Sequence, residues 1–225
     1  PGAAALAVQQ SMKEHSINKA TIVGVVDFGD YTLFTEKAAG RIPKEELVSV
    51  MRWRIKERLP FPAETAAIDV YDAPQVPSEE GEEGTDEGQM MVVAAQPEAI
   101  RAFLPLASRP EMRMVAVDVP ELALRNILAR MPENDQGVAL LHLRDKTSLI
   151  MVVREGHLMV NRQVKIGFNH LHKAMKETLG DPVMAMERAM DPLAHELKRT
   201  LDYYRGRFKI EEPPVIRLAP VENPV

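Results

Sequence analysis

The stretch that decides the fold is residues 137–167, GVALLHLRDKTSLIMVVREGHLMVNRQVKIG. Apolar and β-branched residues fill its first two thirds, and apolar and polar residues then alternate. The dipeptide Glu155-Gly156 between two such runs is a strong hairpin signal. A helical pattern over Asn169 to Leu179 follows at once. The stretch therefore predicts a helix preceded by three consecutive antiparallel strands, at Gly137 to Leu143, Ser148 to Val153 and Leu158 to about Ile166.

Composition limits the class of protein. The 225 residues are 45% hydrophobic and carry a formal charge of −5, with a sequence pI near 5.8. A chain of this size can bury a sizeable core in one or two domains, and its acidity argues against nucleic acid as a partner. The absence of cysteine removes disulfides and thiolate chemistry and fits a cytoplasmic protein. No apolar run reaches about 18 residues, so we expect no membrane-spanning segment.

Much of the acidity is local. Residues 73–88 form an expected acidic loop, because the segment SEEGEEGTDEG at 78–88 combines acidic residues with glycines and offers no apolar surface to bury. It lacks the spacing of a calcium-binding loop. We also expect the sequence to be a fragment trimmed at both ends, because it begins without a methionine or a signal peptide and stops in proline-rich sequence.

Outside residues 137–167 the chain alternates strand and helix patterns. The β-loop-β-α-β pattern of residues 66–118 predicts a small subdomain inserted between two larger lobes, 1–65 and 119–225. Its helix is expected at residues 97–106. Near the end, Asp181-Pro182 and Asp191-Pro192 each predict a helix N-cap followed by a first-turn proline, and hence two separate helices.

Five segments, in order, carry a resemblance to a known family: VSVMRWRIKERLPFPAETAAIDVYDAP (48–74), MMVVAAQPEAIRAF (90–103), MVAVDVPELALRNIL (114–128), the stretch 137–171 and LKRTLDYYRGRF (197–208). Together they resemble type IV pilus assembly proteins of the PilM class. Within that class, members that serve the mannose-sensitive haemagglutinin (MSHA) pilus are the most similar, and the cytoplasmic domain of the type II secretion protein GspL is a further relative. The resemblance implies an actin-like ATPase fold, an α/β fold of two ribonuclease-H-like halves with a small inserted FtsA-type subdomain.

The resemblance also shows where a nucleotide would bind. In nucleotide-binding members, the first turn of the second meander uses an aspartate to hold the metal and a glycine to let backbone N–H groups approach phosphate. Here His142 stands at the aspartate and Arg144 at the glycine, which leaves only weak side-chain contacts from Asp145 and Lys146. A second cradle keeps one glycine, Gly167, before Phe168 and Asn169, and a third falls at residues 219–223, where Pro220 lacks an N–H.

These degenerate positions predict a protein that is not an enzyme. We expect no ATP, magnesium or other cofactor, no metal site and no catalytic residue. The implied function is that of a cytoplasmic scaffold of an MSHA-like type IV pilus machine, peripheral at the inner membrane. The alternative is an actin-like ATPase that binds ATP and polymerises or switches with it.

The implied partner is the cytoplasmic tail of a PilN-like bitopic inner-membrane protein, together with other pilus assembly platform proteins. The resemblance points to the cleft between the first lobe and the insertion, where a short tail docks in a groove or adds to a strand edge. The helix expected at 46–59, the corner at 60–62 and the strand expected at 66–72 lie at that junction. An aromatic anchor with a basic rim is typical of a binding hot spot. The interpretation that Trp53 and Phe61 instead pack helix against sheet stays open. The candidate partner-binding residues are Trp53, Phe61, Arg54 and Arg58.

Overall fold

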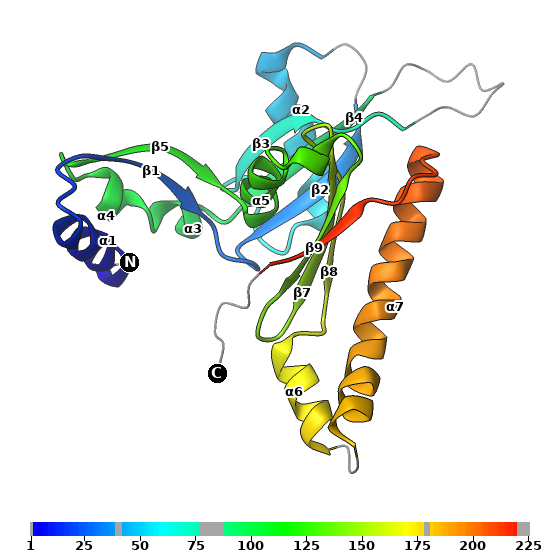
Figure 1. Ribbon diagram of the computed structural model, residues 1–225. Coiled ribbons are helices and arrows are strands. Elements are labelled where there is room, and N and C mark those ends of the chain that lie inside the picture. The colour runs from blue at the N-terminus through cyan, green and yellow to red at the C-terminus, as the bar shows by residue number, and fades with distance from the viewer. Residues whose placement is uncertain (1, 39–41, 77–87, 178–180, 220–225) are drawn as a thin grey trace. The chain divides into compact units, whose positions relative to one another are not determined.

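The computed structural model describes residues 2–38, 42–76, 88–177 and 181–219 (Figure 1). Its contacts group the chain into two compact units, residues 1–73 with 84–123, and residues 74–83 with 124–225. Most of the expected acidic loop, and the third nucleotide turn from Pro220 onward, lie outside the described residues. The division into lobes 1–65 and 119–225 around an insertion stays a prediction, and each unit is described by itself.

The first unit contains a three-stranded antiparallel sheet in the order β2-β4-β3. The helix α2 (Lys44–Ile55) and a 3₁₀ turn (Lys56–Arg58) follow β2 in the chain. The side chains of Met51 and Ile55 on α2 are fully buried against Phe34, Val92 and Ala94 of the sheet. Strand β3 is left at the edge of the sheet. The strands are β2 (Tyr31–Lys37), β3 (Ala67–Asp72) and β4 (Gln89–Ala95).

The same unit contains a parallel pair, β1 (Ala20–Val25) and β5 (Met112–Asp118). Buried Met12, Leu106 and Met112 join this pair to the helices around it. The helix expected at residues 97–106 is in two pieces, because Pro105 lacks the N–H that would continue the first piece. The helices are α1 (Gly2–Glu14), α3 (Pro97–Arg101), α4 (Leu104–Ala107) and, after β5, α5 (Pro120–Leu128), which runs from the first unit into the second.

The second unit is built on the predicted meander, which the structure confirms. Its sheet has the order β8-β7-β6-β9, and β9 pairs parallel to β6. The β7–β8 turn has positive φ at both Glu155 (50°) and Gly156 (76°), as a type I′ hairpin requires. Asn134 accepts hydrogen bonds from both turn amides. The strands are β6 (Val138–Leu143), β7 (Ser148–Arg154), β8 (His157–Val164) and β9 (Val215–Ala219), and a 3₁₀ turn covers Pro132–Asn134.

The helices α6 (Phe168–Glu177) and α7 (Pro182–Phe208) lie beside this sheet (Figure 1). Leu171 of α6 and Leu193 of α7 pack with Ile150 of β7 in one buried cluster. Asp181 caps α7, as predicted, by accepting the Val183 N–H at 2.8 Å. The predicted second start at Asp191-Pro192 is wrong, because Pro192 lies inside α7. Packing keeps the helix continuous through Pro192, because Ala189 before it and Leu193 after it are both buried while Pro192 itself is exposed.

Candidate functional site

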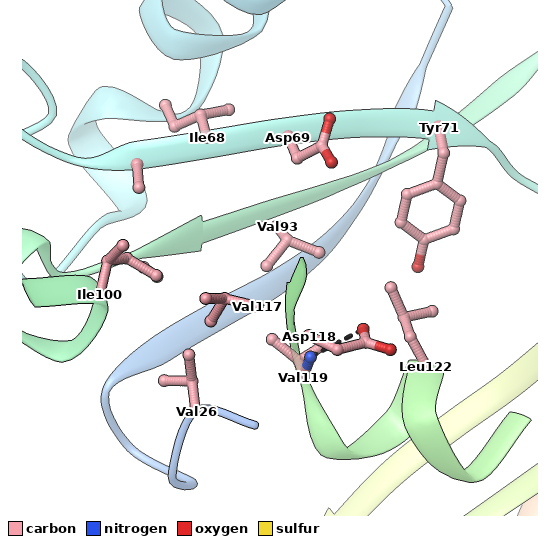
Figure 2. Close-up of a pocket in the computed structure, with 12 residues that line it drawn as sticks. Val26, Ile68, Asp69, Tyr71, Val93, Ile100, Val117, Asp118, Val119 and Leu122 are labelled. Carbon is pink, nitrogen blue, oxygen red and sulfur yellow. Dashed lines mark hydrogen bonds between the residues drawn. The ribbon is translucent and has the colours of Figure 1, made fainter. Parts of the chain in front are cut away.

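A pocket in the first unit is the strongest candidate site. It is a cavity of about 180 Å³ with a mostly apolar lining (Figure 2). One wall comes from β3 and β4. The opposite wall comes from the end of β5, the start of α5, Val26 after β1, and α3. The lining residues are Val26, Ala67, Ile68, Asp69, Tyr71, Val93, Ala95, Ile100, Val117, Asp118, Val119 and Leu122.

Strand pairing shows which face of the β2-β4-β3 sheet the pocket covers. Successive side chains in a strand point to opposite faces, and residues paired across two strands share a face. Ala67 and Asp69 of β3 pair with Ala95 and Val93 of β4, and all four line the pocket. Ile68 packs on the other face, in the cluster around α2. The pocket therefore lies over the face opposite α2 and is bordered by β3, the edge strand.

Three polar side chains interrupt the apolar lining. The Asp118 carboxylate accepts the Val119 N–H at 2.8 Å, and the Asp69 carboxylate accepts the Val70 N–H at 2.9 Å. Figure 2 shows the Tyr71 ring reaching from β3 toward Leu122 of α5. A few fixed polar groups in an apolar cavity are what orient a ligand in a binding site. These groups supply hydrogen-bond acceptors and negative charge, but no arrangement of nucleophile and base for chemistry.

The aromatic candidates lie outside this lining. Trp53 on α2 is 70% exposed, with the Lys56 Nζ 5.9 Å from its ring centroid, so the interpretation that it packs in the core is wrong. Phe61 is half-buried against the cluster around Met51 and Ile55, so for this residue the packing interpretation is confirmed.

The basic candidates also lie outside it, and they tie α2 and its 3₁₀ turn to β2. Arg54 donates to the Lys37 carbonyl at 2.8 Å. The Arg58 guanidinium lies 4.5 Å from the Phe34 ring centroid and pairs with Glu36. The structure thus gives both arginines an intramolecular role, and their part in partner binding stays a prediction.

The nucleotide-loop positions lie together in the second unit, where the β6–β7 turn meets the start of α6. The Arg144 carbonyl accepts the Phe168 N–H at 2.7 Å, and the Asp145 carbonyl accepts the Asn169 N–H at 2.9 Å. The Gly167 N–H donates a hydrogen bond to the His170 Nδ1, with 3.3 Å between the two nitrogens. The first amides of α6, which would bind phosphate in a working cradle, are therefore already bonded within the protein.

Gly167 has a packing role at this junction. A Cβ placed there would lie 2.5 Å from backbone atoms of Arg144, Lys146 and Thr147. The glycine kept from the family pattern therefore allows the close approach of the β6–β7 turn, and the side chains of Asp145 and Lys146 are exposed beside it. His142, at the position of the metal-holding aspartate, is half-buried.

Two further features of the described ranges concern metal binding and membrane insertion. Within residues 2–38, 42–76, 88–177 and 181–219, no three His, Cys, Asp or Glu side chains gather in a metal-binding arrangement. In the same ranges, no helix combines the length and the apolarity needed to span a membrane.

Comparison with solved structures identifies the fold. No protein-family model matches the chain, and no curated protein matches it. A chain of the solved PilM-PilN type IV pilus biogenesis complex matches with a TM-score of 0.68 and 22% identity, over 99% of this chain and 68% of that chain. The chain has the actin-like fold. At this identity the likeness shows the fold alone, and it confirms the actin-like α/β architecture predicted from the sequence.

Two further structures resemble this actin-like chain less closely. The cytoplasmic domain of EpsL, an inner-membrane component of the Vibrio cholerae type II secretion system, matches with a TM-score of 0.45 and 13% identity, over 75% of this chain and 61% of that one. A Bacteroides thetaiotaomicron protein with an actin-like ATPase fold matches with a TM-score of 0.36 and 6% identity, over 89% and 68%. Neither carries weight beside the first likeness.

The sequence placed the strand expected at 66–72 at the docking cleft, but it did not reveal the residues of the pocket's opposite wall. Ala67–Asp69 and Val117–Val119 are separated by about 50 positions, and neither segment contains a motif that announces binding. The one available signal was the AIDVYD strand itself, which places an acidic residue among apolar ones at what proves to be a sheet edge.

Proposed function

We propose that this chain is a non-enzymatic cytoplasmic scaffold of type IV pilus biogenesis, peripheral at the inner membrane, that docks the cytoplasmic tail of a PilN-like bitopic membrane protein. The observation that supports it most is the shared fold over 99% of the chain with a chain from a PilM-PilN complex. The pocket beside β3 gives such a tail a place to bind, because its lining is mostly apolar, contains few polar groups and borders an edge strand.

The finer assignment is to the MSHA pilus, with MshI as the member proposed. Its support is the sequence resemblance, in which the ELALRNIL and ALLHL segments stand at residues 121–128 and 139–143. The first lies in α5 and the second in β6. Both segments form secondary structure of the fold, so their similarity to MshI supports common ancestry, and the binding partner is identified by the experiment below.

The start of α6 supports a scaffold over an ATPase. Its leading amides are bonded to the Arg144 and Asp145 carbonyls, and Arg144 itself stands where a nucleotide-binding member has glycine. A phosphate would have to displace these hydrogen bonds before it could be held, at a cost of about 1 kcal/mol for each. We therefore propose that the protein works without ATP or magnesium.

Co-purification tests this function. The full-length protein is co-expressed, with an affinity tag, with each small bitopic membrane protein encoded in the same gene cluster. We expect one of them to co-purify through its cytoplasmic tail, and its tail-deleted version to be lost. Failure of every such protein to co-purify would contradict the docking function.

A further inference from the structure

The β3 strand has one unpaired side. In the sheet order β2-β4-β3 it stands at the edge, and four of its six residues line the pocket. An unpaired strand edge presents a row of backbone N–H and C=O groups that can pair with another strand. The free edge of β3 therefore borders the pocket, and a strand added there would have every second side chain on the pocket's face of the sheet.

The register with β4 shows which backbone groups face outward. The Ala73 N–H donates to the Gln89 carbonyl at 2.9 Å, in line with the pairing of Tyr71 with Met91 and of Asp69 with Val93. In an antiparallel pair, alternate residues direct both backbone groups at the partner strand and the residues between them direct both away. The outward-facing residues of β3 are therefore Ile68, Val70 and Asp72.

Two side chains already occupy part of this edge. The Arg52 guanidinium donates to the Ala66 carbonyl at 2.9 Å and so closes the edge just before β3. The Asp69 carboxylate accepts the outward Val70 N–H. In the part of the chain that the structure describes, no hydrogen bond reaches the Ile68 N–H, the Val70 carbonyl or the Asp72 N–H.

We infer that the docked tail adds to β3 as a further strand of the β2-β4-β3 sheet. This inference rests on the proposed function and specifies how the tail is held. Its main chain pairs with Ile68, Val70 and Asp72, while alternate apolar side chains enter the pocket. When the tail binds, a tail carbonyl replaces the Asp69 carboxylate as the acceptor of the Val70 N–H. In the unbound protein the charged Asp69 side chain disfavours pairing with other strands, as charged groups on edge strands do.

A matched pair of variants tests the main-chain pairing. Asp72→Pro removes one outward N–H, and Asp72→Ala removes the same exposed side chain but keeps that N–H. Neither touches a hydrogen bond to β4, because Asp72 faces outward, and proline is tolerated at a sheet edge. Binding of the synthetic tail of the co-purified protein is measured by fluorescence anisotropy. We expect Asp72→Pro to bind the tail about five- to tenfold more weakly than Asp72→Ala, the effect of one lost hydrogen bond.

The tail supplies a second readout that needs no protein variant. Single N-methylation at each tail position removes one amide at a time, and strand addition predicts losses of affinity at every second position. Equal affinity of the two Asp72 variants together with a scan that lacks this alternation would overturn strand addition while leaving docking intact. A tail that does not bind the unaltered protein at all would overturn the proposed function, and this inference with it.

Discussion

Gly167 lies where the β6–β7 turn packs against the start of α6. Replacing it with alanine adds one methyl group and tests how closely the two segments are packed. A Cβ at this position would lie only 2.5 Å from three backbone atoms of the turn, so the turn can pack this closely only against glycine. Gly167→Ala should lower the free energy of unfolding by about 2 kcal/mol, in the range found for overpacked sites. Chemical denaturation measures this.

Gly206 is the matched control for that substitution. It lies in α7 with nothing within 4 Å of a Cβ placed on it. Gly206→Ala should raise stability by about 0.5–1 kcal/mol, because alanine is the better helix former. Equal effects of Gly167→Ala and Gly206→Ala on stability would show that the β6–β7 turn can shift to accommodate the methyl group and that it is not closely packed against Gly167.

Substitution of Trp53 distinguishes between two proposed binding sites for the tail, the pocket beside β3 and the exposed face of α2. Because it is 70% exposed, Trp53→Ala should change stability by less than about 0.5 kcal/mol. A tail seated in the pocket beside β3 does not touch Trp53, so we expect unchanged tail affinity as well. A loss of about 2 kcal/mol or more in binding would place the anchor on α2 instead, and Phe61→Ala, which loses half-buried core packing, serves as the destabilising control.

At the scale of elements, α7 continues through Pro192 because the packing of neighbouring residues outweighs the helix-breaking tendency of proline. Pro192 removes one helical N–H and costs roughly 3 kcal/mol relative to alanine in a helix interior, partly offset because proline also restricts the unfolded chain. Pro192→Ala should therefore raise the free energy of unfolding by about 1–2 kcal/mol. Asp181→Ala, which removes the true N-cap, should lower it by about 1 kcal/mol. Thermal melts of both variants check the two signs, and a Pro192→Ala variant less stable than the parent would refute the account of α7.

The same helix shows how far the sequence could predict the elements. The meander was predictable because its turn at Glu155-Gly156 and its β-branched runs are local signals. Asp191-Pro192 gave an equally local helix-start signal and was misleading, because burial of Ala189 and Leu193 depends on elements far away in the chain. The pocket could not be predicted for a related reason, since it exists only where β3 and the end of β5 come together.

For the whole molecule, we expect no stabilisation by nucleotide. A ligand that binds only the folded state adds RT ln(1 + [L]/Kd), about 2.7 kcal/mol at one hundred times its Kd. The melting temperature of the full-length protein should stay unchanged with millimolar Mg-ATP, because the first amides of α6 are already bonded. A clear upward shift would favour the actin-like ATPase over the scaffold.

If a partner's tail binds in the pocket beside β3, a bulky side chain that fills the pocket must block binding. Ala67 and Ala116 are both exposed strand alanines of the first unit, but only Ala67 lines the pocket. The affinity of the partner's tail peptide is measured for Ala67→Trp and Ala116→Trp, after confirming that both melt like the parent. We expect Ala67→Trp to bind the tail at least tenfold more weakly than the parent and Ala116→Trp to bind it equally well. Unchanged binding by Ala67→Trp would contradict binding in this pocket.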